Sequence, residues 1–387
     1  MRLLIALAGA IASAFASATP RMPSADSTVL EQVPAVAATR KLAPLRAAVA
    51  THPEDLRSAL ALAQGYVDIG RATADPRFVS YAQATLGRWV TAPNPDPAAL
   101  TLTATALQYL HRFDAALRLL DQSLAVRASN AQAWLTKATV LQVEGRFDEA
   151  RQACRPLIRL SGQLIALTCL TSVNSLTGRL NSSYLALREV FTDDPRLDPA
   201  VRVWILDQLA DMAQRQGDDA AAERYYHAAL RVNPQDSYTK GDYADLMLRN
   251  GREPELLALL RGDEQQDNLL LRLAIAGTRM RTARARGWAD EFQARYEAAR
   301  RDGDLTHLRE QARFLLEVRG AAKAALDLAI RNWNVQKEPA DVRIYWAAAS
   351  RAGSEADLRR LRDWIRQVRY EDATVGLAGM TPVGVQP

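Results

Sequence analysis

Residues that commonly carry out chemistry are few and scattered in this chain. The four histidines are His52, His111, His227 and His307, and none has another histidine or a cysteine three or four residues away. A zinc site built on helices needs such a spacing. The chain also lacks a G-x-S-x-G motif, a phosphate-binding glycine-rich loop and paired carboxylates within an apolar segment. We therefore expect no catalytic residue, no metal and no cofactor, and we do not expect an enzyme.

The two cysteines are more informative. Cys154 and Cys169 lie on opposite sides of a turn at Ser161-Gly162, each seven or eight residues from it. If an antiparallel helix pair meets at that turn, both cysteines lie at a similar height along it. In an exported protein this pair is a disulfide candidate. The alternative is that both cysteines are small apolar residues buried in the core. The rotation of each helix about its axis decides between a disulfide and a buried pair, and the spacing does not give this rotation.

A basic stripe is the third candidate. Arg272, Arg279 and Arg286 recur every seven residues, and no acid lies between Asp267 and Asp290. On one helix the three arginines would share a face and could bind acidic groups. We favour the alternative, a solvated face that pairs with acids of the neighbouring helix.

The N-terminus resembles an export signal. Arg2 precedes an apolar run from Leu3 to Phe15, and Ala16-Ser17-Ala18 follows. These features predict a signal peptide over residues 1–18 with cleavage after Ala18 and a periplasmic protein. The run is shorter than the roughly 20 residues of a membrane-spanning helix, and no second run of that length follows, so we expect no transmembrane segment in the mature chain. We expect residues 19–40 to form a flexible leader. Residues 371–387 are rich in Gly and Pro, and we expect them to form a disordered tail.

The net charge of +5 is a mild excess for 387 residues. Nucleic-acid binding would need a concentrated basic stripe together with a reading element, and we expect none. A mild basic excess is compatible with anionic lipid, polysaccharide or acidic protein surfaces, although a solvated surface without a ligand has the same composition.

The body of the chain repeats itself. Arg112-Phe113-Asp114-Ala115-Ala116 returns as Arg146-Phe147-Asp148-Glu149-Ala150, 34 residues later. Later turns fall at Gly178, 33 residues after Gly145, and at Gly217 and Gly251, 34 residues apart. Apolar residues recur at helical spacing between these turns. A fixed period of this length predicts stacked helix-turn-helix units.

These units resemble tetratricopeptide repeats. The clearest matches to the large, small, turn-glycine and aromatic positions of that signature are Trp134, Ala138, Leu141, Gly145, Phe147 and Ala150, followed by Ala210, Gly217, Ala222, Tyr226, Ala229 and Pro234. The resemblance implies an all-α fold, a right-handed α-solenoid of stacked helix-turn-helix repeats over residues 41–370. It also implies that the first helix of each pair lines a concave groove that binds partners.

The groove positions implied by this frame change character along the chain. They begin with neutral and hydroxylated residues and continue with Trp204, Asp207 and Asp211, then Tyr238 and Asp245. The Lys, Arg and Asn residues with which some family members hold a partner's C-terminal carboxylate are missing from these positions. An aromatic residue flanked by acids suits a partner segment with an apolar anchor and basic neighbours. Trp204 could equally be a core residue.

The function implied is a periplasmic, non-catalytic scaffold or adaptor that binds a protein or peptide partner in the groove. The sequence does not identify this partner. An alternative is a cell-envelope assembly accessory that binds an anionic glycan, a lipid or a peptidoglycan strand.

Overall fold

The computed structural model describes residues 37–73, 76–301 and 307–375, and all regular secondary structure in these residues is helical. The predicted signal peptide, its cleavage site and the leader up to residue 36 lie outside the described residues. The chain divides into two units, Met1–Lys41 and Leu42–Pro387. The first contains α1 (Ala37–Arg40), and the rest of this description concerns the second. No described helix has the length and apolarity needed to cross a membrane.

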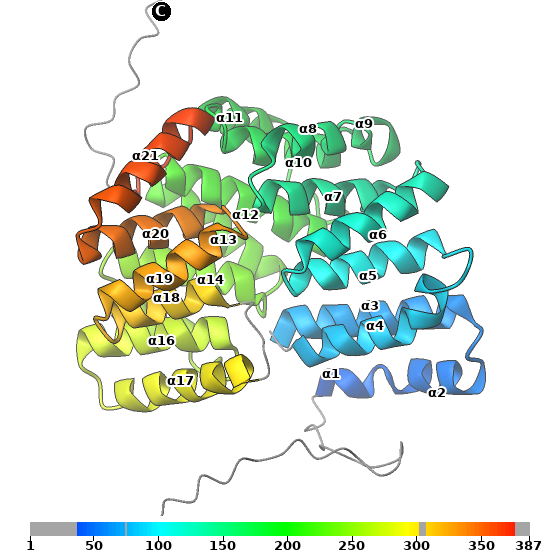
Figure 1. The fold of residues 1–387 in the computed structure, drawn as a ribbon, viewed down its shortest axis with the longest axis horizontal. Helices are drawn as coiled ribbons and strands as arrows, with labels where there is room; N and C mark the ends of the chain where they lie inside the picture. The colour runs from blue at the N-terminus through cyan, green and yellow to red at the C-terminus, as the bar shows by residue number, and fades with distance from the viewer. Residues whose placement is uncertain (1–36, 74–75, 302–306, 376–387) are drawn as a thin grey trace, which may run out of the picture. The chain divides into compact units, whose positions relative to one another are not determined.

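The helices of the second unit follow one another as antiparallel pairs (Figure 1). They are α2 (Ala43–Thr51), α3 (Leu56–Thr73), α4 (Pro76–Val90), α5 (Pro97–Tyr109), α6 (Phe113–Val126), α7 (Ala131–Val143), α8 (Phe147–Cys154), α9 (Leu157–Leu160), α10 (Gln163–Ser175), α11 (Leu180–Val190), α12 (Pro199–Arg215), α13 (Asp219–Val232), α14 (Ser237–Arg249), α15 (Glu253–Leu259), α16 (Asp267–Met280), α17 (Ala285–Arg301), α18 (Leu308–Glu317), α19 (Ala322–Trp333), α20 (Pro339–Ala352) and α21 (Glu355–Val368). The predicted fold class, an all-α stack of helix pairs, is confirmed.

The repeat signature has a direct structural meaning. Ala138 and Ala150 are buried at 1% and 0% exposure where helices touch, which a larger side chain would prevent. The turn inside each pair needs a positive φ, which glycine adopts without strain, and Gly145 has φ +79° there. His111 occupies the same turn position in α5–α6 with φ 53° and stacks on Phe113. The repeat frame therefore fixes both the close contacts and the turns.

One second helix is broken. Pro156 lacks the N–H that would continue the hydrogen-bond ladder, so α8 ends at Cys154 and α9 forms a separate turn. In the structure the sulfur atoms of Cys154 and Cys169 are bonded, with their Cα atoms 5.7 Å apart. Both cysteines are also buried, at 0% and 4% exposure, so they are part of the core as well as a crosslink.

Late helix pairs pack against early ones. A single hydrophobic core joins residues of α5–α10 to residues of α18–α21, including the ring contact between Phe147 and Trp364 at 6.4 Å. The Lys337 N–H, between α19 and α20, donates to the Val143 carbonyl at 2.7 Å. Helix α14 likewise contacts α3. The repeat array within this unit therefore turns back on itself, and residues far apart in sequence share one core.

The segment after α21 completes this closure. Tyr370, Asp372 and Val375 are buried at 3–5% exposure. The Ala373 N–H donates to the Arg215 carbonyl at 2.7 Å, and the Leu180 N–H donates to Glu371 Oε2 at 2.8 Å. We call residues 370–375 the C-terminal clasp. Residues 371–375, assigned by the sequence to a disordered tail, are thus packed in this unit, and residues 376–387 lie outside the described residues.

Candidate partner-binding surface

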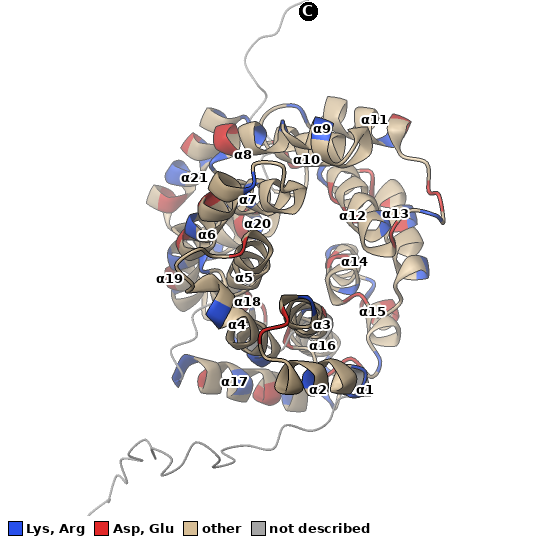
Figure 2. Ribbon diagram, turned by 90° about the vertical axis from the view of Figure 1, so that its right-hand side faces the viewer, with Lys and Arg blue, Asp and Glu red and all other residues tan. Residues whose placement is uncertain are grey.

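The aromatic and acidic residues proposed for binding come from two successive first helices. Trp204, Asp207 and Asp211 belong to α12, and Tyr238 and Asp245 belong to α14, which follows α12 in the array (Figure 2). Tyr238 is 55% exposed, an unusual state for a large aromatic side chain in this chain. Trp204 is half-buried and packs against the core of this part of the array, so it is partly structural.

Asp207 lies against the start of α14. Both of its carboxylate oxygens accept from Thr239 Oγ1 at 3.0 Å, and no cation within the described residues pairs with it. Burial raises the pKa of Asp207 well above its usual value, and the neighbouring charges of Asp242 and Asp236 raise it further. A cation supplied by a partner would relieve that unfavourable charge.

Asp242 is a site residue that the sequence analysis missed. It lies four residues after Tyr238 on α14, so the same helical periodicity that selected Tyr238 and Asp245 could have found it. The residue keeps an accessible surface, but the surrounding protein displaces much of the water near its carboxyl. This desolvation, with the charge of Asp245, raises the pKa of Asp242 to about 7.

Asp211 and Asp245 differ from these two acids because the chain already supplies their cations. Asp211 pairs with Arg215 at 2.8 Å. Asp245 pairs with Arg272 and Arg313, each at 2.6 Å. Burial opposes ionisation of Asp245, yet the two guanidinium groups lower its pKa below the usual value. Asp245 therefore joins α14 to α16 and α18, and Asp211 orients Arg215 on its own helix, whereas Asp207 and Asp242 remain to meet an external cation.

The basic stripe does not lie on one helix. Helix α16 ends at Met280, and Arg281 adopts a left-handed conformation with φ 55°, so Arg286 belongs to α17. The premise of one shared face is therefore wrong. Arg272 pairs with Asp245, and Arg279 pairs with Glu253 at 3.1 Å and Glu317 at 2.7 Å. Both arginines thus match the alternative interpretation, pairing with acids of neighbouring helices.

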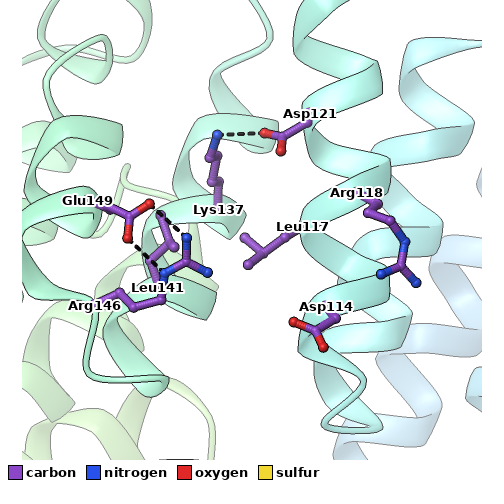
Figure 3. A pocket seen from close by; sticks show the side chains of 8 residues that line it. All are labelled: Asp114, Leu117, Arg118, Asp121, Lys137, Leu141, Arg146 and Glu149. Carbon is purple, nitrogen blue, oxygen red and sulfur yellow. Dashed lines mark hydrogen bonds and ion pairs between the residues drawn. The ribbon is translucent and has the colours of Figure 1, made fainter.

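A cavity of about 290 Å³ lies among α6, α7 and α8 (Figure 3). Leu117 and Leu141 contribute its apolar lining, and the ion pair between Lys137 and Asp121, at 2.5 Å, lies at its edge. Its charged groups largely neutralise one another. Within the residues the structure describes, no group of three or more His, Cys, Asp or Glu residues is arranged to hold a metal ion.

The titration of Asp242 gives a testable consequence. Between about pH 4, the ordinary aspartate value, and about pH 7, the folded protein retains a proton that the unfolded chain has released. Stability contributed by this group therefore falls as pH rises through that window. Asp242→Asn should raise the free energy of unfolding more at about pH 8 than at about pH 5, measured by denaturant unfolding. Asp363→Asn, at an exposed site on α21, serves as the control, and an equal gain at both pH values would contradict the assignment.

Comparisons with solved structures find other helical-repeat proteins. A monomeric mutant of IFIT1, solved with Gppp-AAAA, shares 12% identity over 85% of this chain and 76% of that one, with a TM-score of 0.50. A tetratricopeptide-repeat protein of Thermus thermophilus shares 19% identity over 50% of this chain and 98% of its own, with a TM-score of 0.38. A tetratricopeptide-repeat protein of Parabacteroides merdae shares 13% identity over 76% of this chain and 98% of its own, with a TM-score of 0.36.

No family model and no curated protein sequence matches the chain. The fold assignment therefore rests on three features of the structure. They are the helix pairs, the 33- and 34-residue intervals between turn glycines, and the small residues where the helices touch. The chain therefore has the α-solenoid fold of tetratricopeptide-repeat proteins.

Proposed function

We propose that the protein is a non-catalytic scaffold of the periplasm that binds an extended segment of a partner protein on the inner helices α12 and α14. The observation that carries the proposal is the combination of an exposed aromatic residue, Tyr238, with two acids that form no ion pair among the described residues, Asp207 and Asp242. The Cys154–Cys169 disulfide supports an oxidising compartment such as the periplasm.

The chemistry of the site defines the kind of segment. An apolar side chain of the partner packs on Tyr238 and on the accessible part of Trp204. A neighbouring Lys or Arg pairs with Asp242 and Asp207, which favours their ionised forms because the added cation compensates for desolvation. Asp211 and Asp245 keep the surrounding helices in place through their own arginines. The binding residues are thus Trp204, Asp207, Tyr238 and Asp242, with Asp211 and Asp245 behind them.

Selection from a displayed library of random peptides tests this proposal without a known partner. Peptides recovered on the purified protein should be enriched in Lys or Arg next to an apolar residue. Tyr238→Ala should weaken the best peptide by about 2 kcal/mol, the typical size for a central aromatic contact. Asp207→Asn with Asp242→Asn should weaken binding and reduce its salt dependence, because neither amide can pair with the cation of the peptide.

Tyr81→Ala is the matched control, because Tyr81 is an exposed tyrosine, at 41%, on the second helix α4. Equal binding by the Tyr238→Ala, acid-substituted and parent proteins would reject the site. If Trp204→Ala unfolds the protein, Trp204 is a core residue, and the Tyr238 and acid variants still decide the proposal.

The second candidate, an envelope-assembly accessory that binds an anionic glycan, lipid or peptidoglycan strand, would use a different surface. The exposed apolar residues Ile158 and Leu160 lie beside the exposed Arg155 and Arg159 in the sequence, and this combination favours the lipid among these ligands.

A further inference from the structure

Exposed apolar side chains are concentrated on one part of the array. Nine large apolar residues are exposed within the described part of the chain, and five of them lie on α6, α9 and α11. They are Val126 at 65%, Ile158 at 57%, Leu160 at 36%, Leu185 at 41% and Val190 at 41% exposure. Single exposed apolar residues are ordinary on a protein surface, so the clustering, and not the exposure itself, is informative.

The repeat register places four of these residues along one edge. Val126, Leu160 and Val190 are the last residues of α6, α9 and α11. Each of these residues therefore lies at the end of the second helix of a repeat, in three consecutive repeats. Ile158 lies two residues before Leu160. In a solenoid, equivalent ends of successive second helices lie beside one another, about 10 Å apart. Figure 2 looks onto the connections that follow these helices, and α6, α9 and α11 succeed one another around the same rim. We call Val126, Ile158, Leu160 and Val190 the apolar edge.

The charge around the apolar edge is positive. Arg127, Arg155 and Arg159 adjoin its apolar residues, and in the described part of the chain none of these three forms an ion pair. Arg188, two residues before the end of α11, lies over the Tyr184 ring at 5.3 Å. From Ala150 to Phe191 the sequence has five arginines and a single acid, Glu189.

The acids that follow the edge are already paired within the chain. Asp193 pairs with Arg202 at 2.8 Å, and Asp194 pairs with Arg196 at 2.7 Å. With these acids paired, Glu189 is the remaining acid of the segment, and the arginines of the edge keep an excess of positive charge. The occupant that complements the edge is therefore anionic as well as apolar.

We propose that the apolar edge rests on an anionic phospholipid surface. Aliphatic side chains at the ends of separate helices can insert at the boundary between headgroups and acyl chains, while adjacent arginines bind the phosphates. A fluid bilayer surface can meet all three helix ends at once, although they are a repeat apart. The apolar edge contains no residue of α12 or α14, so this contact does not depend on the peptide site described above.

Sedimentation with lipid vesicles tests the proposal. The full mature chain should sediment with vesicles of phosphatidylglycerol and phosphatidylcholine, and far less with phosphatidylcholine alone. Ile158→Ser with Leu160→Ser should lower the partition coefficient about tenfold, because two aliphatic side chains no longer insert. Arg155→Gln with Arg159→Gln should lower it comparably and also weaken its dependence on salt.

Met280→Ser with Val335→Ser is the matched control, since these residues are exposed to a similar extent, at 43% and 40%, but lie on other parts of the array. All substituted residues are exposed, so circular dichroism should show intact helices. Tyr238→Ala should leave vesicle binding unchanged, which separates this test from that of the peptide site.

Absence of binding to the anionic vesicles overturns the proposal, as does equal binding to both lipid mixtures or an unchanged partition coefficient in the edge variants. Self-association without vesicles that the serine variant abolishes would also overturn it, because the edge would then join two copies of the chain.

Discussion

Replacing Arg215 with methionine should lower the free energy of unfolding by about 3–5 kcal/mol, the usual effect of removing one partner from a buried ion pair. The Arg215 side chain is only 1% exposed, at the end of α12. Its Nε donates to Asp211 Oδ2 at 2.8 Å, its Nη1 donates to the Ser175 carbonyl at 2.8 Å, and its Nη2 donates to Ser175 Oγ at 2.7 Å. Methionine fills a similar volume but leaves these buried acceptors without a donor.

The same substitution should loosen the C-terminal clasp. Arg215 Nη1 also donates to the Glu371 carbonyl at 3.4 Å, and its guanidinium lies 5.9 Å from the Tyr370 ring centroid. Hydrogen exchange should therefore show a larger loss of protection at Tyr370–Val375 and α21 than at α3 and α4, which lie outside this contact.

Denaturant unfolding measures the first effect, and Arg196→Met is its control. Arg196 also pairs with an aspartate, Asp194, but its side chain is 90% exposed, so its removal should leave the midpoint unchanged. Arg215→Lys keeps the charge without the planar fork and should fall between methionine and the parent protein. A midpoint for Arg215→Met equal to that of the parent protein would show that the Arg215 side-chain contacts contribute nothing to stability.

The repeat frame could be predicted from the sequence because it depends on local contacts. The turn glycines, the small residues such as Ala138 and the helix pairs all follow from residues within about one 34-residue period. The shared core of α5–α10 and α18–α21 could not be predicted, because it depends on how far each pair rotates on the one before it. Small rotations add up over many repeats, and no short-range pattern records their sum.

The candidate site shows the same division. Helical spacing could place Trp204, Asp207 and Asp211 on one side of α12. On α14 the position equivalent to Asp207 is Gly241, so the frame passes over Asp242, which lies four residues after Tyr238. Helical spacing could not show that Arg313, from α18, neutralises Asp245, or that Thr239 holds Asp207. The distinction between acids that hold the fold and acids available to a partner is therefore a property of tertiary packing.

Removing the Cys154–Cys169 disulfide should lower the free energy of unfolding by about 3 kcal/mol, because the bond closes a loop of about 15 residues and so restricts the unfolded chain. The bond joins the end of α8 to the middle of α10 across the Pro156 break and the α9 turn. That break removes a continuous second helix from this repeat, so the crosslink replaces part of the lost rigidity. The loss should appear in denaturant unfolding with and without reductant.

A variant with Cys154→Ala and Cys169→Ala provides the control, because it keeps both positions small and apolar at sites that are 0% and 4% exposed. Reductant should lower the unfolding midpoint of the parent protein toward that of the alanine variant and leave the variant unchanged. The chain has no other cysteine, so thiol titration of the denatured, unreduced protein should find no free thiol. Two titratable thiols per chain, or an equal shift of the variant by reductant, would show that these residues are only a small apolar pair in the core.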